Sequence, residues 1–144
     1  MTTTPTGRLA TEKYVSMVTY RKDGTPVATA VWVVADGDAL LVWTGATAGK
    51  VKRVRANPAV TVAPCSARGK VRGDAVTGHA EVCDARGSDR TRELIMKKYR
   101  IQGWFLVRRS LRRSGPDATV GLRVTFPATL EAAAADSGAA EPVA

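Results

Sequence analysis

The chain has 144 residues, of which 44% are hydrophobic, and this suits one globular domain with its own core rather than a disordered chain. No apolar run approaches the roughly 18–20 residues of a membrane-spanning helix, and the first residues lack the apolar core of a secretory signal, so we expect a cytoplasmic protein without a membrane partner. The formal net charge of +9 predicts anionic partners, which include a phosphorylated cofactor, an acidic substrate or a nucleic acid.

The first part of the chain predicts an antiparallel meander of three strands. β-Branched and aromatic residues gather in short runs, and Asp23-Gly24 and Asp36-Gly37 between them supply the positive φ that tight hairpin turns need. The strands are predicted at residues 14–20, 25–35 and 40–43. The Thr-rich residues 1–10 are expected to be flexible.

The rest of the chain predicts helices that alternate with further strands. Asn57-Pro58 stops the first helix, because proline cannot continue a helix, and Gly115-Pro116 ends the last one. The expected helices cover residues 50–56, 88–100 and 104–113. The expected strands cover residues 59–63, 70–82 and 118–126.

Six short strands, mostly joined by hairpins, predict a mainly β protein, a six-stranded antiparallel barrel with inserted helices. This domain would span residues 11–127. The Ala-rich residues 128–144 carry no pattern that could form a core, so they predict a disordered tail.

Cysteine and histidine usage limits metal chemistry. Cys65 and Cys83 fit no metal-binding spacing and cannot make a disulfide framework, so we expect two reduced thiols. His79 is the only histidine, which excludes a multi-histidine metal site. We therefore predict that the protein holds no metal.

The stretch LLVWTGATAGKVKRVRANP, residues 40–58, carries the strongest functional signal. A strand, a turn of small residues and a helix start present free backbone N–H groups and the positive end of the helix dipole. Lys50 and Arg53 are three residues apart and share a helix face, and Thr44 adds a hydroxyl. We expect a phosphate at this point. The alternative is a solvated helix with four positive charges.

Other candidates are less specific. Trp32 and Trp43 lie on neighbouring predicted strands and could border a planar ring, or they could fill the core. His79 could act as a base, although a lone histidine on a polar strand face is more often structural. The sequence shows no catalytic triad, no paired carboxylates and no Walker loop, so any chemistry would rest on a cofactor.

Basic residues gather in two blocks that contain no Asp or Glu, at residues 39–73 and 94–116. Their cations are Lys50, Lys52, Arg53, Arg55, Arg68, Lys70 and Arg72, then Lys97, Lys98, Arg100, Arg108, Arg109, Arg112 and Arg113. The blocks suit an extended anion, or they only keep a basic protein soluble. Aromatic residues make up 6% of the chain and offer few surfaces for stacked bases, so the sequence argues against nucleic acid.

Four segments form a recognisable set: TPVATAVWVV, LLVWTGATAGKVKRVRANPAV, APCSARG and VTGHAEV. Together they resemble the pyridoxamine 5'-phosphate oxidase-like family over about residues 10–126. The resemblance implies a split β-barrel of the FMN-binding type. The patterns TGxxxGKVKRVRxNP and APCxxRG look most like the branch of the family that binds the deazaflavin coenzyme F420.

The resemblance also implies a homodimer with two cofactor sites at the subunit interface. In the family, the strand that matches residues 29–32 runs along the cofactor ring through its backbone groups. Lys50 matches the lysine that binds the phosphate, Arg53 assists it, and Arg72 reaches over from the partner subunit. The residues implied to bind the cofactor are Thr29, Ala30, Val31, Trp32, Trp43, Thr44, Ala48, Gly49, Lys50, Arg53 and Arg72.

One departure from the family pattern bears on the cofactor. Many flavin-binding members carry Ser-Arg-Lys where this chain has Ala48-Gly49-Lys50, and the loss of two polar side chains weakens a phosphate site for FMN. Coenzyme F420 also carries a polyglutamate tail, which the basic blocks would suit. F420 is therefore the expected cofactor, and FMN is the alternative.

The implied function is an F420-dependent reductase that transfers a hydride from the reduced deazaflavin to an electron-poor small molecule, such as an enone, a quinone or a tetrapyrrole. Catalysis would consist mainly of positioning, and no catalytic residue is assigned. The alternatives are an FMN-dependent oxidase or reductase of the same fold, a non-catalytic F420- or tetrapyrrole-binding protein, and a nucleic-acid binder.

Overall fold

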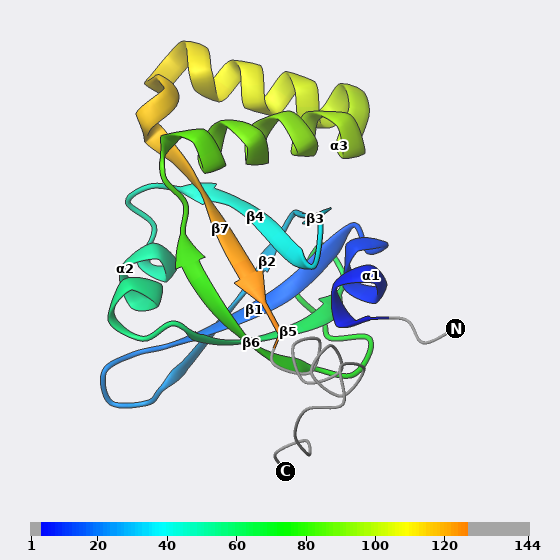
Figure 1. Ribbon diagram of the computed structural model, residues 1–144, viewed down its shortest axis with the longest axis vertical. Coiled ribbons are helices and arrows are strands. Elements are labelled where there is room, and N and C mark those ends of the chain that lie inside the picture. The colour runs from blue at the N-terminus through cyan, green and yellow to red at the C-terminus, as the bar shows by residue number, and fades with distance from the viewer. Residues whose placement is uncertain (1–3, 127–144) are drawn as a thin grey trace, which may run out of the picture.

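Within residues 4–126, β-branched and aromatic runs form seven strands, each antiparallel to its neighbours. The computed structural model describes residues 4–126, so the predicted tail at residues 128–144 lies outside the described residues. The strands are β1 (Tyr14–Tyr20), β2 (Pro26–Val31), β3 (Val33–Asp36), β4 (Ala39–Gly45), β5 (Ala59–Cys65), β6 (Val76–Val82) and β7 (Thr119–Thr125). They form one sheet in the order β2-β1-β5-β6-β7-β4-β3, which curls into an open split barrel (Figure 1).

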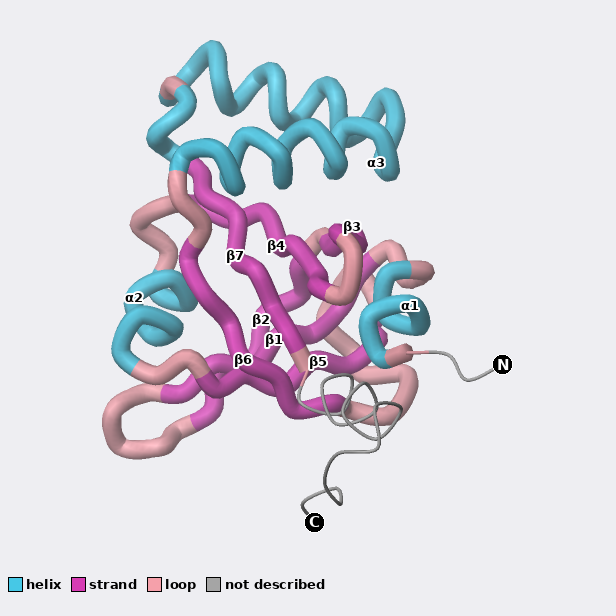
Figure 2. Tube along the Cα trace, in the orientation of Figure 1, coloured by secondary structure: helices cyan, strands magenta, loops and turns pink. Residues whose placement is uncertain are grey.

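Helices lie around this sheet. They are α1 (Pro5–Ala10), α2 (Gly49–Ala56), α3 (Ala85–Ser114) and the short 3-10 helix η1 (Pro116–Ala118). Helix α1 lies against β3 and β4, α2 joins β4 to β5, and α3 joins β6 to β7. Figure 2 shows α3 as a separate layer that covers one side of the sheet, while α2 lies at one edge of the barrel.

Two hydrophobic cores follow from the alternation of side chains along the strands. Leu40 and Val42 of β4 point into the barrel, whereas Leu41 and Trp43 point to the opposite face of the sheet. The first core fills the barrel. The second core lies between the sheet and α3, where Ile95 is fully buried.

The strand predicted over residues 25–35 is two strands, so the sheet has seven strands and not the predicted six. β2 pairs with β1 and β3 pairs with β4, which means that the chain changes partner at Trp32. The residues on both sides of Trp32 favour strand structure, so the local sequence gives no sign of the break.

Two side chains of α3 hold this bend. The Val33 backbone N–H donates to the Tyr99 hydroxyl at 3.0 Å, and that hydroxyl donates to the Lys13 carbonyl at 2.6 Å. The Tyr99 ring stacks on Trp32, with ring centroids 4.2 Å apart. The Lys98 ammonium donates to the Val33 carbonyl at 2.6 Å and to two carbonyls at and just after the end of α1. Burial lowers the pKa of Lys98 to about 8 and raises the pKa of Tyr99 to about 12, so both groups keep their protons at neutral pH.

The N-terminal residues expected to be flexible form α1 from Pro5 onward. The Thr4 side chain caps this helix by accepting a hydrogen bond from the Gly7 backbone N–H at 3.0 Å. Leu9 is fully buried in the barrel core. Leu9 and the buried Thr6 hold this helix against the rest of the chain, and the sequence did not indicate the helix because one apolar residue makes no periodic pattern.

The strand predicted over residues 70–82 begins only at Val76. Gly69 turns the chain after β5 with a φ of +87°, which glycine adopts without strain. Of residues 70–75, only Val71 forms a bridge, to Cys65. β5 instead extends two residues further than predicted.

The two helices predicted over residues 88–100 and 104–113 are the two arms of α3. The first arm covers residues 85–100 and the second arm covers residues 101–114. Arg100, with a φ of 51° and a ψ of −125°, kinks the helix so that the arms lie side by side (Figure 1). Asp84 caps the first arm a few residues earlier than predicted, and Gly115 ends the second arm as predicted.

We predict that Tyr99→Phe lowers the free energy of unfolding by about 1–3 kcal/mol, because it leaves the buried Val33 N–H without its acceptor. Urea denaturation measures the change. Tyr20→Phe is the control, since the Tyr20 hydroxyl bonds only the half-buried Thr61 hydroxyl, and it should cost less than about 1 kcal/mol. Equal stability losses for the two variants would contradict the role given to Tyr99.

Gly103 lets the second arm pack on the first. A Cβ at this position would lie 2.7 Å from the Ile95 carbonyl oxygen and 2.8 Å from the Tyr99 Cβ. We therefore predict that Gly103→Ala costs about 1–3 kcal/mol of stability, as overpacking does. Gly45→Ala is the control, because a Cβ there meets no atom within 4 Å. Equal melting temperatures of the two variants in thermal denaturation would contradict the role given to Gly103.

Candidate anion-binding site at the start of helix α2

The start of α2 offers backbone donors that no side chain caps. Ala48 is the N-cap in an extended conformation, and no acidic residue lies in the first turn. The turn before the helix is tight, since the Ala48 N–H donates to the Gly45 carbonyl at 3.1 Å. The end of β4 thus leads directly into a helix whose positive end is available to an anion.

Lys50 brings a full positive charge to this helix start. Its ammonium group is half-buried and donates to the Thr44 hydroxyl at 3.3 Å. Burial lowers the pKa of Lys50, and the nearby charge of Arg53 lowers it further. In the part of the chain that the structure describes, neither cation forms an ion pair. The site therefore has an uncompensated positive charge.

Arg53 comes from the next turn of α2 and folds back over the helix start. Its Nε donates to the Thr19 hydroxyl at 2.6 Å. A Cβ on Gly49 would lie only 2.7 Å from the Arg53 Nη1, so the guanidinium group occupies the space that a side chain at 49 would need. Glycine at this position thus leaves that space to the end of the Arg53 side chain.

Thr19 completes the arrangement, and sequence analysis did not select it. Thr19 is fully buried on β1, on the face that Val15 and Met17 turn into the barrel. It fixes the Arg53 side chain through the hydrogen bond to Nε. The available signal was a threonine at an inward position of an otherwise apolar strand face.

β2 contributes an open edge and one unsatisfied hydroxyl. Thr29 lies opposite Met17 in the register, so it faces the barrel interior, and its Oγ1 is buried without a hydrogen-bond partner among residues 4–126. Val31 is buried in the barrel core, and Ala30 is half-exposed. β2 is an edge strand that pairs only with β1, so its outer backbone groups remain open to a ligand or a partner strand.

The two tryptophans point away from the cations. Trp43 and Thr44 are neighbours on β4, so their side chains project to opposite faces of the sheet. Trp43 lies 6.3 Å from Trp32, centroid to centroid, and both pack in the second core beneath α3. Both aromatic rings are thus partly buried against the second core.

Arg72 lies apart from the other predicted residues. Its backbone N–H donates to the Pro64 carbonyl, and Pro64 lies opposite Val15, near the other end of β1 from Thr19. Its side chain is exposed. The structure brings together Thr44, Ala48, Gly49, Lys50 and Arg53. The predicted role of Arg72, at the site of a second subunit, stays a prediction.

Within residues 4–126, no group of three or more His, Cys, Asp or Glu side chains could hold a metal ion. None of the helices in that range combines the length and the apolar character that a bilayer crossing needs. His79 is exposed, with its Nε2 3.8 Å from the Glu81 carboxylate.

A family model agrees with this fold. The model described as pyridoxamine 5'-phosphate oxidase matches residues 6–126. The chain belongs to this family, as the sequence resemblance indicated. The family includes flavin-related oxidoreductases built on the same split barrel.

Solved structures share the fold at low sequence identity. The conserved hypothetical protein Rv2991 from Mycobacterium tuberculosis is 19% identical over 84% of this chain and 77% of its own, with a TM-score of 0.63. The heme storage protein HutZ from Vibrio cholerae is 13% identical over 80% and 82%, with a TM-score of 0.59. An F420 reductase is 19% identical over 83% and 90%, with a TM-score of 0.50. A search of curated proteins found no match.

The uncompensated cations predict opposite effects on stability and on anion binding. In a buffer without phosphate or other multivalent anions, Lys50→Met should raise Tm by about 2–4 °C, because it removes a half-buried charge beside Arg53. A gain of about 1 kcal/mol in the free energy of unfolding produces such a shift. The same variant should lose the rise in Tm that pyrophosphate gives the unmodified protein.

Lys52→Met is the matched control, since Lys52 is an exposed cation on the same helix. It should change neither Tm nor the response to pyrophosphate. Differential scanning fluorimetry measures both quantities. A fall in Tm for Lys50→Met in the same buffer would show that Lys50 stabilises the fold, and would contradict its assignment to an anion site.

Proposed function

We propose that the protein binds coenzyme F420 at the start of α2 and acts as an F420-dependent reductase of small electron-poor acceptors. The observation that carries the proposal is the convergence of Lys50 and Arg53 on an uncapped helix start without a carboxylate partner among the described residues. Family membership and the F420 reductase among the structural relatives support an oxidoreductase with a flavin-like cofactor.

The donor set fits the phosphate of such a cofactor. Lys50 and Arg53 supply charge-assisted hydrogen bonds, and the first backbone N–H groups of α2 supply further donors. The unsatisfied Thr29 hydroxyl and the open edge of β2 supply polar groups along the inner side of the barrel. When bound, the deazaflavin supplies a hydride to the acceptor.

The residues of the chain would bind and orient rather than exchange protons. The described site contains threonines, lysine and arginine, and no carboxylate or histidine with a pKa suited to acid–base work at neutral pH. The proton that completes the reduction would come from solvent. The proposed acceptors are enones, quinones or tetrapyrroles, and catalysis would rest on proximity.

The small residues at the helix start favour F420 over FMN. A side chain at position 49 would displace the Arg53 guanidinium, so the Ser-Arg pair of many flavin-binding members cannot be accommodated without moving Arg53. In the proposal the active form is a cytoplasmic homodimer, because the open edge of β2 and the exposed Arg72 leave room for a second subunit to complete each site.

Parallel fluorescence titrations with F420 and FMN at moderate salt test the proposal. We expect micromolar or tighter binding of F420 and much weaker binding of FMN. Lys50→Ala should weaken F420 binding by about 1.5–3 kcal/mol, the value of a hydrogen bond to a charged group. Lys52→Ala serves as the control and should leave the dissociation constant within about twofold.

Three results would count against the proposal. Binding of FMN alone would move the function to the flavin branch of the family. An unchanged dissociation constant in Lys50→Ala would remove the α2 site. Tight F420 binding without turnover of any acceptor would indicate a storage or carrier protein, a function that the name of HutZ states for that relative and its heme.

A further inference from the structure

The second arm of α3 presents an unusual outer surface. It forms the outermost layer of the molecule, and its inner side is buried through Gly103 and Val107 (Figure 1). Its outer side exposes Trp104 at 50% and Phe105 at 55% of their full areas. Two exposed aromatic side chains at adjacent positions are uncommon on a surface that faces only water.

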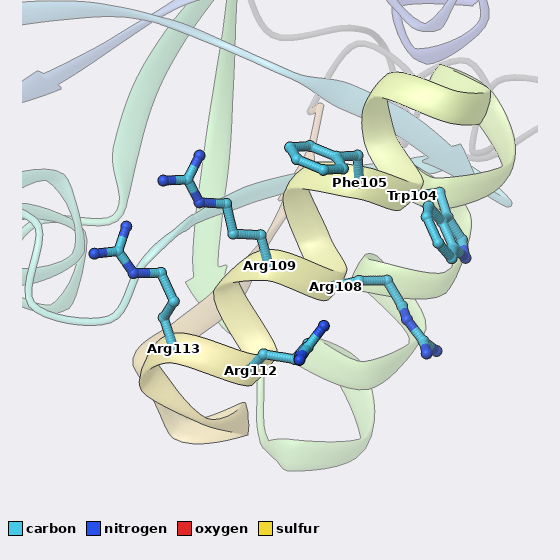
Figure 3. A pocket seen from close by; sticks show the side chains of 6 residues that line it. All are labelled: Trp104, Phe105, Arg108, Arg109, Arg112 and Arg113. Atoms are coloured by element: carbon cyan, nitrogen blue, oxygen red, sulfur yellow. The ribbon is translucent and has the colours of Figure 1, made fainter.

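Four arginines continue the surface along the helix. Trp104, Arg108 and Arg112 are spaced four residues apart and form one row, and Phe105, Arg109 and Arg113 form a parallel row. Figure 3 shows the two rows projecting to opposite sides of the helix, each with its aromatic ring at one end and two guanidinium groups after it. We call these six residues the aromatic–arginine groove. The Arg108 guanidinium lies 5.4 Å from the centroid of the Trp104 ring.

The positive charge of the groove is not neutralised within residues 4–126. Residues 94–116 contain no Asp or Glu, and none of the four arginines forms an ion pair with the described residues. Guanidinium groups bind carboxylates and phosphates through two parallel hydrogen bonds and also stack on flat rings. The surface is therefore suited to a ligand that carries both negative charges and flat rings.

The six side chains line an open pocket of about 590 Å³ on the outer side of the arm, a volume within the range of small-molecule sites. We propose that the aromatic–arginine groove is a binding site for a flat conjugated small molecule that carries several carboxylates or phosphates. The ring system of the ligand stacks on Trp104. Its negative groups are held by the arginine pairs further along each row.

The lining argues against other occupants. All six lining residues are aromatic or cationic, so an acyl chain in the pocket would leave four guanidinium groups without negative partners. A second copy docked face to face through a two-fold axis would bring eight arginines together. The proposal is also independent of the α2 site, because the groove shares no residue with it.

Equilibrium titrations of the full-length protein with pyrenetetracarboxylate test the proposal, at an ionic strength of about 0.15 M. This probe is flat and carries four carboxylates. Tetraglutamate carries similar charge without rings, and a thymidine decamer represents single-stranded nucleic acid. We expect micromolar binding of the pyrene probe and at least about tenfold weaker binding of the other two.

The variants separate rings from charge. Trp104→Leu and the pair Arg109→Gln with Arg113→Gln should each weaken binding of the probe by about tenfold or more, since each removes contacts that the ligand needs. Arg68→Gln, an exposed arginine in the turn after β5, should change it by less than about twofold. Lys50→Ala should leave it unchanged. Far-UV circular dichroism checks that each variant is folded.

Four outcomes would overturn the proposal. These are no saturable binding of the probe, equal binding of tetraglutamate, an equal loss in Arg68→Gln, and tighter binding of the thymidine decamer, which would assign the groove to nucleic acid. A loss of probe binding in Lys50→Ala would show that the probe binds at the α2 site, which would contradict a separate site on α3. Failure of F420 binding alone leaves the result with the pyrene probe unaffected.

Discussion

The fold depends on how α3 holds the backbone at the bend after Trp32. Val33 changes sheet partner at this point, and its N–H and carbonyl groups are bound by Tyr99 and Lys98. Without these donors and acceptors, two buried backbone groups would lack partners at the corner of the barrel. The same two side chains also bind carbonyls in and after α1, so one turn of α3 joins three parts of the chain.

This constraint separates the two positively charged regions. Trp32 and Trp43 pack beneath α3 on one face of the sheet, whereas Thr19 and Thr44 lie on the barrel side, next to the apolar core, and bond the cations of α2. The second arm of α3 lies further out and exposes its arginines to solvent. The helix that completes the fold thus also carries the second charged surface.

The charges of the α2 site lower the stability of the folded protein. Lys50 is half-buried beside Arg53, and both burial and that neighbour lower its pKa. The charged lysine therefore destabilises the folded protein when no ligand is bound. Such strain is typical of sites that await a charged partner. An anion bound at the helix start would interact favourably with both cations and offset their mutual repulsion.

The sequence allowed much of this to be predicted, wherever the signal was local. Residues 50–56 and the end of the last helix at Gly115 were predicted from proline, glycine and charge, and the structure confirms them within a residue. The bend at Trp32 and the role of Thr19 could not be predicted, because both depend on side chains of distant elements, Tyr99 and Arg53. The functions of the site residues, including Arg72 across a dimer interface, stay predictions.

A crystal structure of the protein with bound F420 tests the central claim most directly. We predict a dimer in which the phosphate of the cofactor lies within hydrogen-bond distance of Lys50 Nζ, Arg53 and the first backbone N–H groups of α2. A phosphate bound elsewhere, with Lys50 and Arg53 still free of the ligand, would contradict it.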